Sequence, residues 1–169
     1  MSIPTLRSVD HIGFTVPSID EAVAFFEKHF GFRVAYAHGP FSSEDDWMSV
    51  HLNVKPRDVL EKIVMMEAGN MLLEIFEYTA SEAQKKVGPM NSDVGGHHVA
   101  FYVDDMSQAV AYLRAQGLSV LGEPTVMETG PTAGETWVYF LSPWGMQLEL
   151  VSYPKGKGYE RDRRAAVTP

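Results

Sequence analysis

Apolar and polar residues alternate over residues 9–16, which is typical of a strand with one buried face. Pro17-Ser18 then favours a turn. Apolar residues recur at helical spacing over residues 19–30, and Gly31 follows as a helix stop. This part of the chain therefore predicts a short strand, a tight turn and an amphipathic helix.

The same arrangement occurs again 87 positions later (98 minus 11). Residues 10–26, DHIGFTVPSIDEAVAFF, align with residues 97–113, HHVAFYVDDMSQAVAYL, so that His11 coincides with His98. An internal repeat of this kind indicates a duplicated structural unit, and it constrains the architecture more strongly than any single element.

Three further segments with strand character follow each copy. They are residues 32–37, 62–67 and 71–78 in the first half and residues 118–124, 136–142 and 146–153 in the second. The order strand, helix, strand, strand, strand thus occurs twice, which predicts an α+β fold with two βαβββ modules. Residues 38–57 are expected to form a long inserted loop, with a short helix after it at residues 58–62.

These elements predict four parts of the chain. The parts are a first module at residues 1–78, a linker at 79–94, a second module at 95–154 and a charged tail at 155–169. The tail contains several Lys and Arg residues, which we expect to be solvated rather than bound to a partner.

Composition excludes several function classes. Lys and Arg number 14 and Asp and Glu 22, so the net charge of −8 disfavours a nucleic-acid partner. The chain has no cysteine, which excludes disulfides, thiolate catalysis and Cys-based zinc sites. No secretory leader is recognisable and no apolar stretch approaches the roughly 20 residues that span a bilayer. We therefore expect a cytoplasmic protein without a membrane partner.

The last predicted strand of each half carries one glutamate among apolar residues. Glu74 lies in MLLEIF and Glu149 lies in MQLELV, at matching places in the two halves. A carboxylate in such a strand is costly to bury unless it is paired, hydrogen-bonded or bound to a metal. With the aligned histidines, these residues form the set His11, Glu74, His98 and Glu149.

Each member of this set also has an ordinary structural explanation. A single strand histidine is more often hydrogen-bonded within the fold, a single strand glutamate more often faces solvent, and duplication copies structural pairs too. The recurrence of two residue types at two matching places nevertheless favours one divalent metal site, with Zn, Ni, Co, Fe or Mn as the candidate ions. Such an ion is a Lewis acid for a carbonyl, and a glutamate beside it can serve as the base.

Several other histidines and glutamates have no equivalent residue in the other half of the repeat. They are His29, His38, His51, His97, Glu67 and Glu77. His97 is expected to point away from the side of the strand that carries His98. His51, in the long insertion, is either a surface residue or a substrate contact. The two glutamates are expected to face solvent.

With these residues in view, the chain resembles the vicinal oxygen chelate superfamily, also called the glyoxalase/bleomycin resistance/dioxygenase superfamily. The resemblance covers residues 8–154 and rests on DHIGFTVPSIDEAVAFF, NMLLEIFEY, GGHHVAFYVDDMSQAVAYL and SPWGMQLELVSYP. It implies two βαβββ modules in a cupped mixed sheet around one metal site, with the helices outside. In glyoxalase I and methylmalonyl-CoA epimerase the first and last strands of each module supply the ligands, which implies His11, Glu74, His98 and Glu149 here.

The resemblance also implies a metal-dependent isomerase, epimerase or lyase. Such an enzyme removes a proton next to a carbonyl and stabilises the enediolate of a small oxygenated substrate. Glu149 is the first choice for the base, with Glu74 as its counterpart. The candidate substrate contacts are Thr15, Trp47, His51, Tyr102, Trp137 and Tyr139, each of which also suits ordinary packing. A homodimer is expected, and the site forms either within one chain or across the dimer.

Two other functions fit the same fold. One is an Fe(II) extradiol-type dioxygenase, although that class uses two histidines and one glutamate in a longer chain. The other is a binding or resistance protein without turnover, which would not need all four ligands. The insertion at residues 38–57 and the turn at Trp144-Gly145 depart from glyoxalase I and disfavour a glutathione adduct as substrate. Epimerases of small sugar-like or cyclitol ketones belong to the same superfamily and also stay open.

Overall fold

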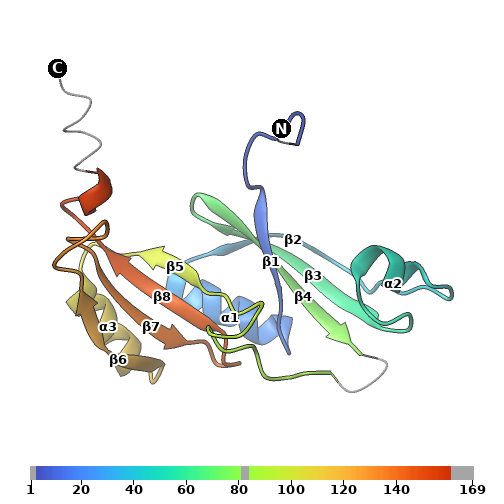
Figure 1. The fold of residues 1–169 in the computed structure, drawn as a ribbon. Coiled ribbons are helices and arrows are strands. Elements are labelled where there is room, and N and C mark those ends of the chain that lie inside the picture. The colour runs from blue at the N-terminus through green and yellow to red at the C-terminus, as the bar shows by residue number, and fades with distance from the viewer. Residues whose placement is uncertain (1–2, 81–83, 161–169) are drawn as a thin grey trace. The chain divides into compact units, whose positions relative to one another are not determined.

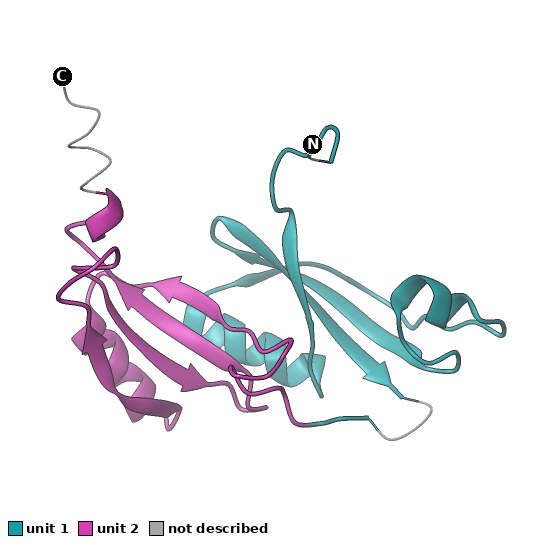
Figure 2. Ribbon diagram, in the orientation of Figure 1, with its two compact units in different colours: residues 1–86 teal, residues 87–169 magenta. Residues whose placement is uncertain are grey.

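The structure, a computed structural model, describes residues 3–80 and 84–160 of the chain. It divides into two compact units, Met1–Lys86 and Val87–Pro169 (Figure 2). Each unit contains one four-stranded mixed sheet and one helix of ten or more residues. The predicted α+β class with two βαβββ modules is therefore confirmed. Among the described residues, no helix is both long enough and apolar enough to cross a membrane.

The first unit follows the predicted order with one additional helix (Figure 1). Its elements are β1 (His11–Thr15), α1 (Ile19–Phe30), β2 (Arg33–His38), α2 (Trp47–Leu52), β3 (Val59–Ala68) and β4 (Met71–Thr79). The strand order is β1-β4-β3-β2, and β1 runs parallel to β4 while the other pairs are antiparallel. β3 and β4 form the expected hairpin around Gly69-Asn70.

Within its described residues, 87–160, the second unit has the same topology without an equivalent of α2. Its elements are β5 (Val99–Tyr102), α3 (Met106–Ala115), β6 (Ser119–Val126), β7 (Thr136–Leu141) and β8 (Gln147–Ser152). The order is β5-β8-β7-β6, with β5 parallel to β8. Each first strand thus lies beside the last strand of its own unit, which brings the aligned histidines next to the aligned glutamates.

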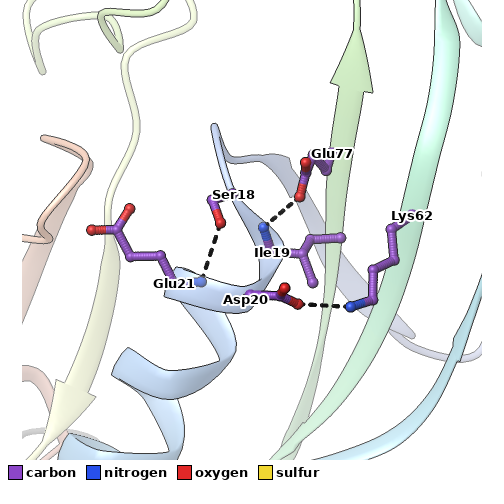
Figure 3. A network of polar contacts seen from close by, with 6 residues as sticks. All are labelled: Ser18, Ile19, Asp20, Glu21, Lys62 and Glu77. Atoms are coloured by element: carbon purple, nitrogen blue, oxygen red, sulfur yellow. Dashed lines mark hydrogen bonds and ion pairs between the residues drawn. The ribbon is translucent and has the colours of Figure 1, made fainter.

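Helix α1 begins and ends at residues with clear capping chemistry. The Ser18 side chain accepts a hydrogen bond from the Glu21 N–H (3.3 Å), and Gly31 adopts the left-handed conformation (φ 67°) that closes the helix. Glu77, on β4, also accepts a hydrogen bond from the Ile19 N–H (2.7 Å), as Figure 3 shows. The expectation that Glu77 faces solvent is therefore wrong, because its carboxylate satisfies a free donor at the helix N-terminus.

One face of the first sheet is apolar and lies under α1. The contact of Phe14 on β1 with Phe26 on α1 (ring centroids 6.2 Å apart) marks this face. Side chains alternate along a strand, so Leu73 and Ile75, which are almost fully buried, share the face with Phe14. Glu74, between them, must then point to the opposite face. In the second unit α3 packs against β6 and β8.

The inserted segment differs from the prediction. A helix was expected at residues 58–62, but residues 59–62 begin β3, and the helix is α2 at Trp47–Leu52. Pairing with β4 and an additional bridge from Phe41 to Leu60 hold residues 59–62 extended. Met48 of α2 is fully buried against Leu60 and Ile63, and these residues form a second small core.

Candidate metal centre

In the first unit, strand register brings one predicted pair together. Gly13 on β1 is opposite Glu74 on β4, and His11 lies two residues before Gly13, on the same face of the sheet. The His11 Nε2 atom is 3.0 Å from Oε2 of Glu74. The other ring nitrogen, Nδ1, is 2.9 Å from Oδ2 of Asp10.

The second unit repeats this arrangement in the same register. Ala100 on β5 is opposite Glu149 on β8, and His98 lies two residues before Ala100. The His98 Nε2 atom is 3.2 Å from Oε2 of Glu149, and its Nδ1 atom is 3.3 Å from Oδ1 of Asn91. His97 does not share this contact, because its Nδ1 atom lies 3.1 Å from the carbonyl oxygen of Gly95.

The two Nδ1 partners, Asp10 and Asn91, did not emerge from the sequence as site residues. Asp10 directly precedes His11, so a carboxylate next to a candidate ligand was a usable signal. Asn91 lies seven residues before His98 in an irregular segment, and no sequence pattern indicates its contact. Partners of this kind fix the ring orientation and leave Nε2 to serve as a ligand atom.

The electrostatic environments of the two pairs differ. The hydrogen bond with Asp10 raises the pKa of His11, burial opposes this rise, and the charges of Glu74 and Asp10 add to it. Burial raises the pKa of the Glu149 carboxyl, and the charge of Glu135 adds to this while His98 opposes it. Glu149 is also the less accessible carboxylate, with a side chain 11% exposed against 22% for Glu74.

Aromatic residues surround Glu149 on its face of the second sheet. Tyr139 is directly opposite Glu149, and its ring centroid lies 5.1 Å from those of both His98 and Trp137. Burial, followed by the charge of Glu149, raises the pKa of Tyr139. Tyr102 shares this face, since it and Trp137 are both opposite Val151, two residues beyond Glu149. Three of the predicted substrate contacts thus lie on the sheet face that carries Glu149.

The remaining predicted contacts belong to the first unit. Thr15 is exposed and lies two residues beyond Gly13, on the face that carries His11. Trp47 and His51 contact each other on α2 (ring centroids 4.6 Å apart), and Phe41 packs on Trp47. The structure therefore groups Trp47 and His51 with the inserted segment.

Tyr78 is a further residue near Glu74 that the sequence did not single out for the site. Burial raises the pKa of its hydroxyl, and the charges of Glu74 and Asp58 raise it further. Tyr78 lies four residues after Glu74 on β4, so both side chains leave the same face of the strand.

The other residues without a counterpart in the second half contact different partners. His29 contacts Phe25 within α1, and His38 stacks on Tyr36 of β2. Glu67 is exposed and forms an ion pair with Arg33 (3.0 Å), so its expected exposure is correct.

Lys157, a basic residue of the predicted tail, is not solvated as expected. Its Nζ atom lies 3.1 Å from Oε2 of Glu135, and its side chain is only 20% exposed. Lys157 is therefore held in an ion pair rather than solvated. The last nine residues of the predicted tail, 161–169, lie outside the described residues.

The donor atoms in each unit fit a divalent metal ion. Two neighbouring ligands at about 2.1 Å from one ion are about 3 Å apart when they subtend a right angle, which is close to both His–Glu spacings. Imidazole nitrogen and carboxylate oxygen are suitable ligands for the borderline metals. Within residues 3–80 and 84–160, no three His, Asp or Glu side chains form a ready cluster, so each unit presents a pair.

Comparisons with known proteins identify the family of this chain and a curated relative. Residues 10–140 match the Glyoxalase/Bleomycin resistance protein/Dioxygenase superfamily. A 2-epi-5-epi-valiolone epimerase from an Actinomyces species is 44% identical over 161 residues, which cover 94% of this chain and 86% of that protein.

Solved structures with low identity share the fold. A glyoxalase family protein from Bacillus cereus has a TM-score of 0.63 at 20% identity, with 89% of this chain and 98% of that chain covered. A fosfomycin resistance protein from Listeria monocytogenes, solved with Mn(II) and a sulfate ion, has a TM-score of 0.55 at 17% identity, with 93% and 98% covered. On the sequence match, this chain belongs to the glyoxalase/bleomycin resistance/dioxygenase superfamily.

Proposed function

We propose that this protein is a metal-dependent epimerase of a small cyclitol ketone, with 2-epi-5-epi-valiolone as the first substrate to test. The observation that carries the proposal is the duplicated His–Glu pair, found at the same strand register in both units. The 44% identical relative, which is named for epimerisation of that compound, supplies the substrate class. Superfamily membership alone would leave the reaction open.

The proposed metal ligands are His11, Glu74, His98 and Glu149, and the candidate ions are Zn, Ni, Co, Fe and Mn. The support is chemical: each histidine keeps Nε2 beside a glutamate oxygen while Asp10 or Asn91 occupies Nδ1. The bound ion would supply Lewis acidity that makes the carbon next to a ketone easier to deprotonate.

Epimerisation requires a proton to leave one face of a carbon and return to the opposite face. Two glutamates in equivalent positions suit this chemistry, since one carboxylate can accept the proton while the other donates one. Glu149 is our first choice for the base because its side chain is the more buried and is surrounded by aromatic rings. A desolvated carboxylate binds a proton more readily than an exposed one.

Solvent exchange of the substrate tests the proposal. The purified protein, supplied with one candidate divalent ion at a time, is incubated with 2-epi-5-epi-valiolone in deuterium oxide, and the compound is followed by proton NMR. We expect deuterium at the carbon next to the carbonyl together with a second epimer. If no cyclitol ketone exchanges with any of the five ions, the epimerase proposal is wrong. Oxygen uptake with a catechol would instead indicate a dioxygenase.

The assembly is a separate proposal. The homodimer expected from the sequence is tested by size-exclusion chromatography with light scattering, where a mass of about twice 18.8 kDa supports it and a mass of one chain contradicts it.

A further inference from the structure

Glu135 and Lys157 form a partly buried ion pair in the second unit. Glu135 directly precedes β7, and Lys157 follows β8 by five residues. The Nζ and Oε2 atoms are 3.1 Å apart, and the two side chains are 20% and 10% exposed. Replacement of a buried ion pair by apolar residues is often neutral or stabilising, so stability alone is a weak reason to place one here.

The segment that carries Lys157 is held in place by its backbone. The Tyr159 N–H donates to the carbonyl oxygen of Pro131 (2.8 Å), in the loop between β6 and β7. A Cβ atom on Gly158 would lie only 2.7 Å from the carbonyl oxygen of Gly130, so this close approach requires glycine. The two residues after Lys157 therefore hold this segment against the loop between β6 and β7.

Lys157 also contacts an aromatic residue just beyond the strand that carries the proposed base. Its Nζ atom is 4.4 Å from the ring centre of Tyr153, whose ring contacts Tyr102 (centroids 4.8 Å apart). Tyr102 is one of the candidate substrate contacts, and Tyr153 directly follows β8, the strand that carries Glu149.

We propose that Lys157 binds a hydroxyl or carbonyl oxygen of the substrate and that Glu135 is its positioning residue. An ammonium group has three donors, and the ion pair with Glu135 and the ring of Tyr153 leave it further hydrogen-bonding capacity. A cyclitol ketone presents several oxygens around its ring, and a charged donor in a largely desolvated place binds such oxygens well. This inference rests on the proposed function, because it assigns a contact to the same substrate.

The test compares Lys157→Met with a matched control, Lys155→Met, in the metal-loaded full-length protein. Lys155 is an exposed lysine two residues earlier in the same segment. We expect Lys157→Met to raise the KM for the cyclitol ketone by about tenfold to a hundredfold, the value of one charge-assisted hydrogen bond. We expect kcat to change by less than about threefold, and the control to match the unmodified protein.

A second pair of variants separates binding from folding. Lys157→Met leaves the Glu135 carboxylate without its cation, so its melting temperature can fall for structural reasons. Glu135→Gln/Lys157→Met removes both charges, and we expect it to regain thermal stability while the raised KM persists. Glu135→Gln alone should also raise the KM. The KM of the double variant should not exceed that of Lys157→Met, because the glutamate acts through the lysine.

Two results would overturn the inference. One is a KM for Lys157→Met equal to that of Lys155→Met, and the other is recovery of the normal KM in the double variant, which would make the ion pair structural only. Absence of exchange in the unmodified protein is a different result, since it refutes the epimerase proposal itself.

Discussion

Glu74 and Glu149 occupy equivalent positions but have different neighbours. Across the sheet, Met65 is opposite Glu74 whereas Tyr139 is opposite Glu149. The repeat in the sequence identified both glutamates because their positions relative to the ends of the modules match. It could not identify Tyr139 as the neighbour of Glu149, since cross-strand pairing depends on register that the sequence leaves unspecified.

These neighbours lead to a prediction for the two glutamates as single residues. If each carboxylate serves one face of the reacting carbon, Glu149→Gln should lose deuterium exchange with one epimer and keep it with the other, and Glu74→Gln should do the opposite. We expect each lost exchange rate to fall by about a hundredfold or more, as for removal of a general base. The measurement is proton NMR in deuterium oxide with each epimer in turn.

Metal content provides the control for this experiment. Glutamine retains one oxygen ligand, so both variants must be compared at full metal occupancy, measured by inductively coupled plasma mass spectrometry. Equal loss of exchange with both epimers in one variant, at full occupancy, would contradict the assignment of one face to each glutamate.

Helices and strands could be predicted from the sequence where local signals mark their ends. The bounds of α1 agree with the predicted residues 19–30 because Ser18 and Gly31 mark both ends. No comparable signal marks α2, and the extra segment has no counterpart in the other half to guide its interpretation. Residues 58–62 were misassigned because their extended conformation comes from pairing with β4, a contact remote in sequence.

Helix α2 provides the prediction at this scale. Met48 is fully buried against Leu60 and Ile63, so Met48→Ala should reduce the free energy of unfolding by about 2–4 kcal/mol through loss of packing and a cavity. Val50, on the same helix, is 73% exposed, and Val50→Ala should change stability by no more than about 0.5 kcal/mol. Urea denaturation measures both. Similar losses in the two variants would show that Met48 does not anchor the helix.

The whole molecule consists of two units that each hold a sheet, a helix and one His–Glu pair. This division was predictable in outline because duplication leaves a visible repeat in the sequence. The repeat alone does not predict how the two pairs are used, since a duplicated pair can supply half of one site or the whole of another.

Metal stoichiometry distinguishes these two arrangements. If all four residues bind the same ion, the protein should hold one ion per chain, and His11→Ala and His98→Ala should each lose most of it. If each pair binds its own ion, the count should be two per chain, and each variant should retain one. The measurement is metal content after gel filtration. Removal of the ion with a chelator should also lower the melting temperature, because the ion binds the folded state.

The close approach of Gly158 to the carbonyl oxygen of Gly130 has an evolutionary consequence. The loop between β6 and β7 and the segment around Gly158 cannot change in sequence independently. A side chain at position 158 would require a compensating change in that loop. The match to the superfamily ends at residue 140, before Glu149 and Lys157. We therefore expect the residues of this loop to vary together with positions 157 and 158 among close relatives of this chain. Distant members of the superfamily, which share only the fold, should not show this co-variation.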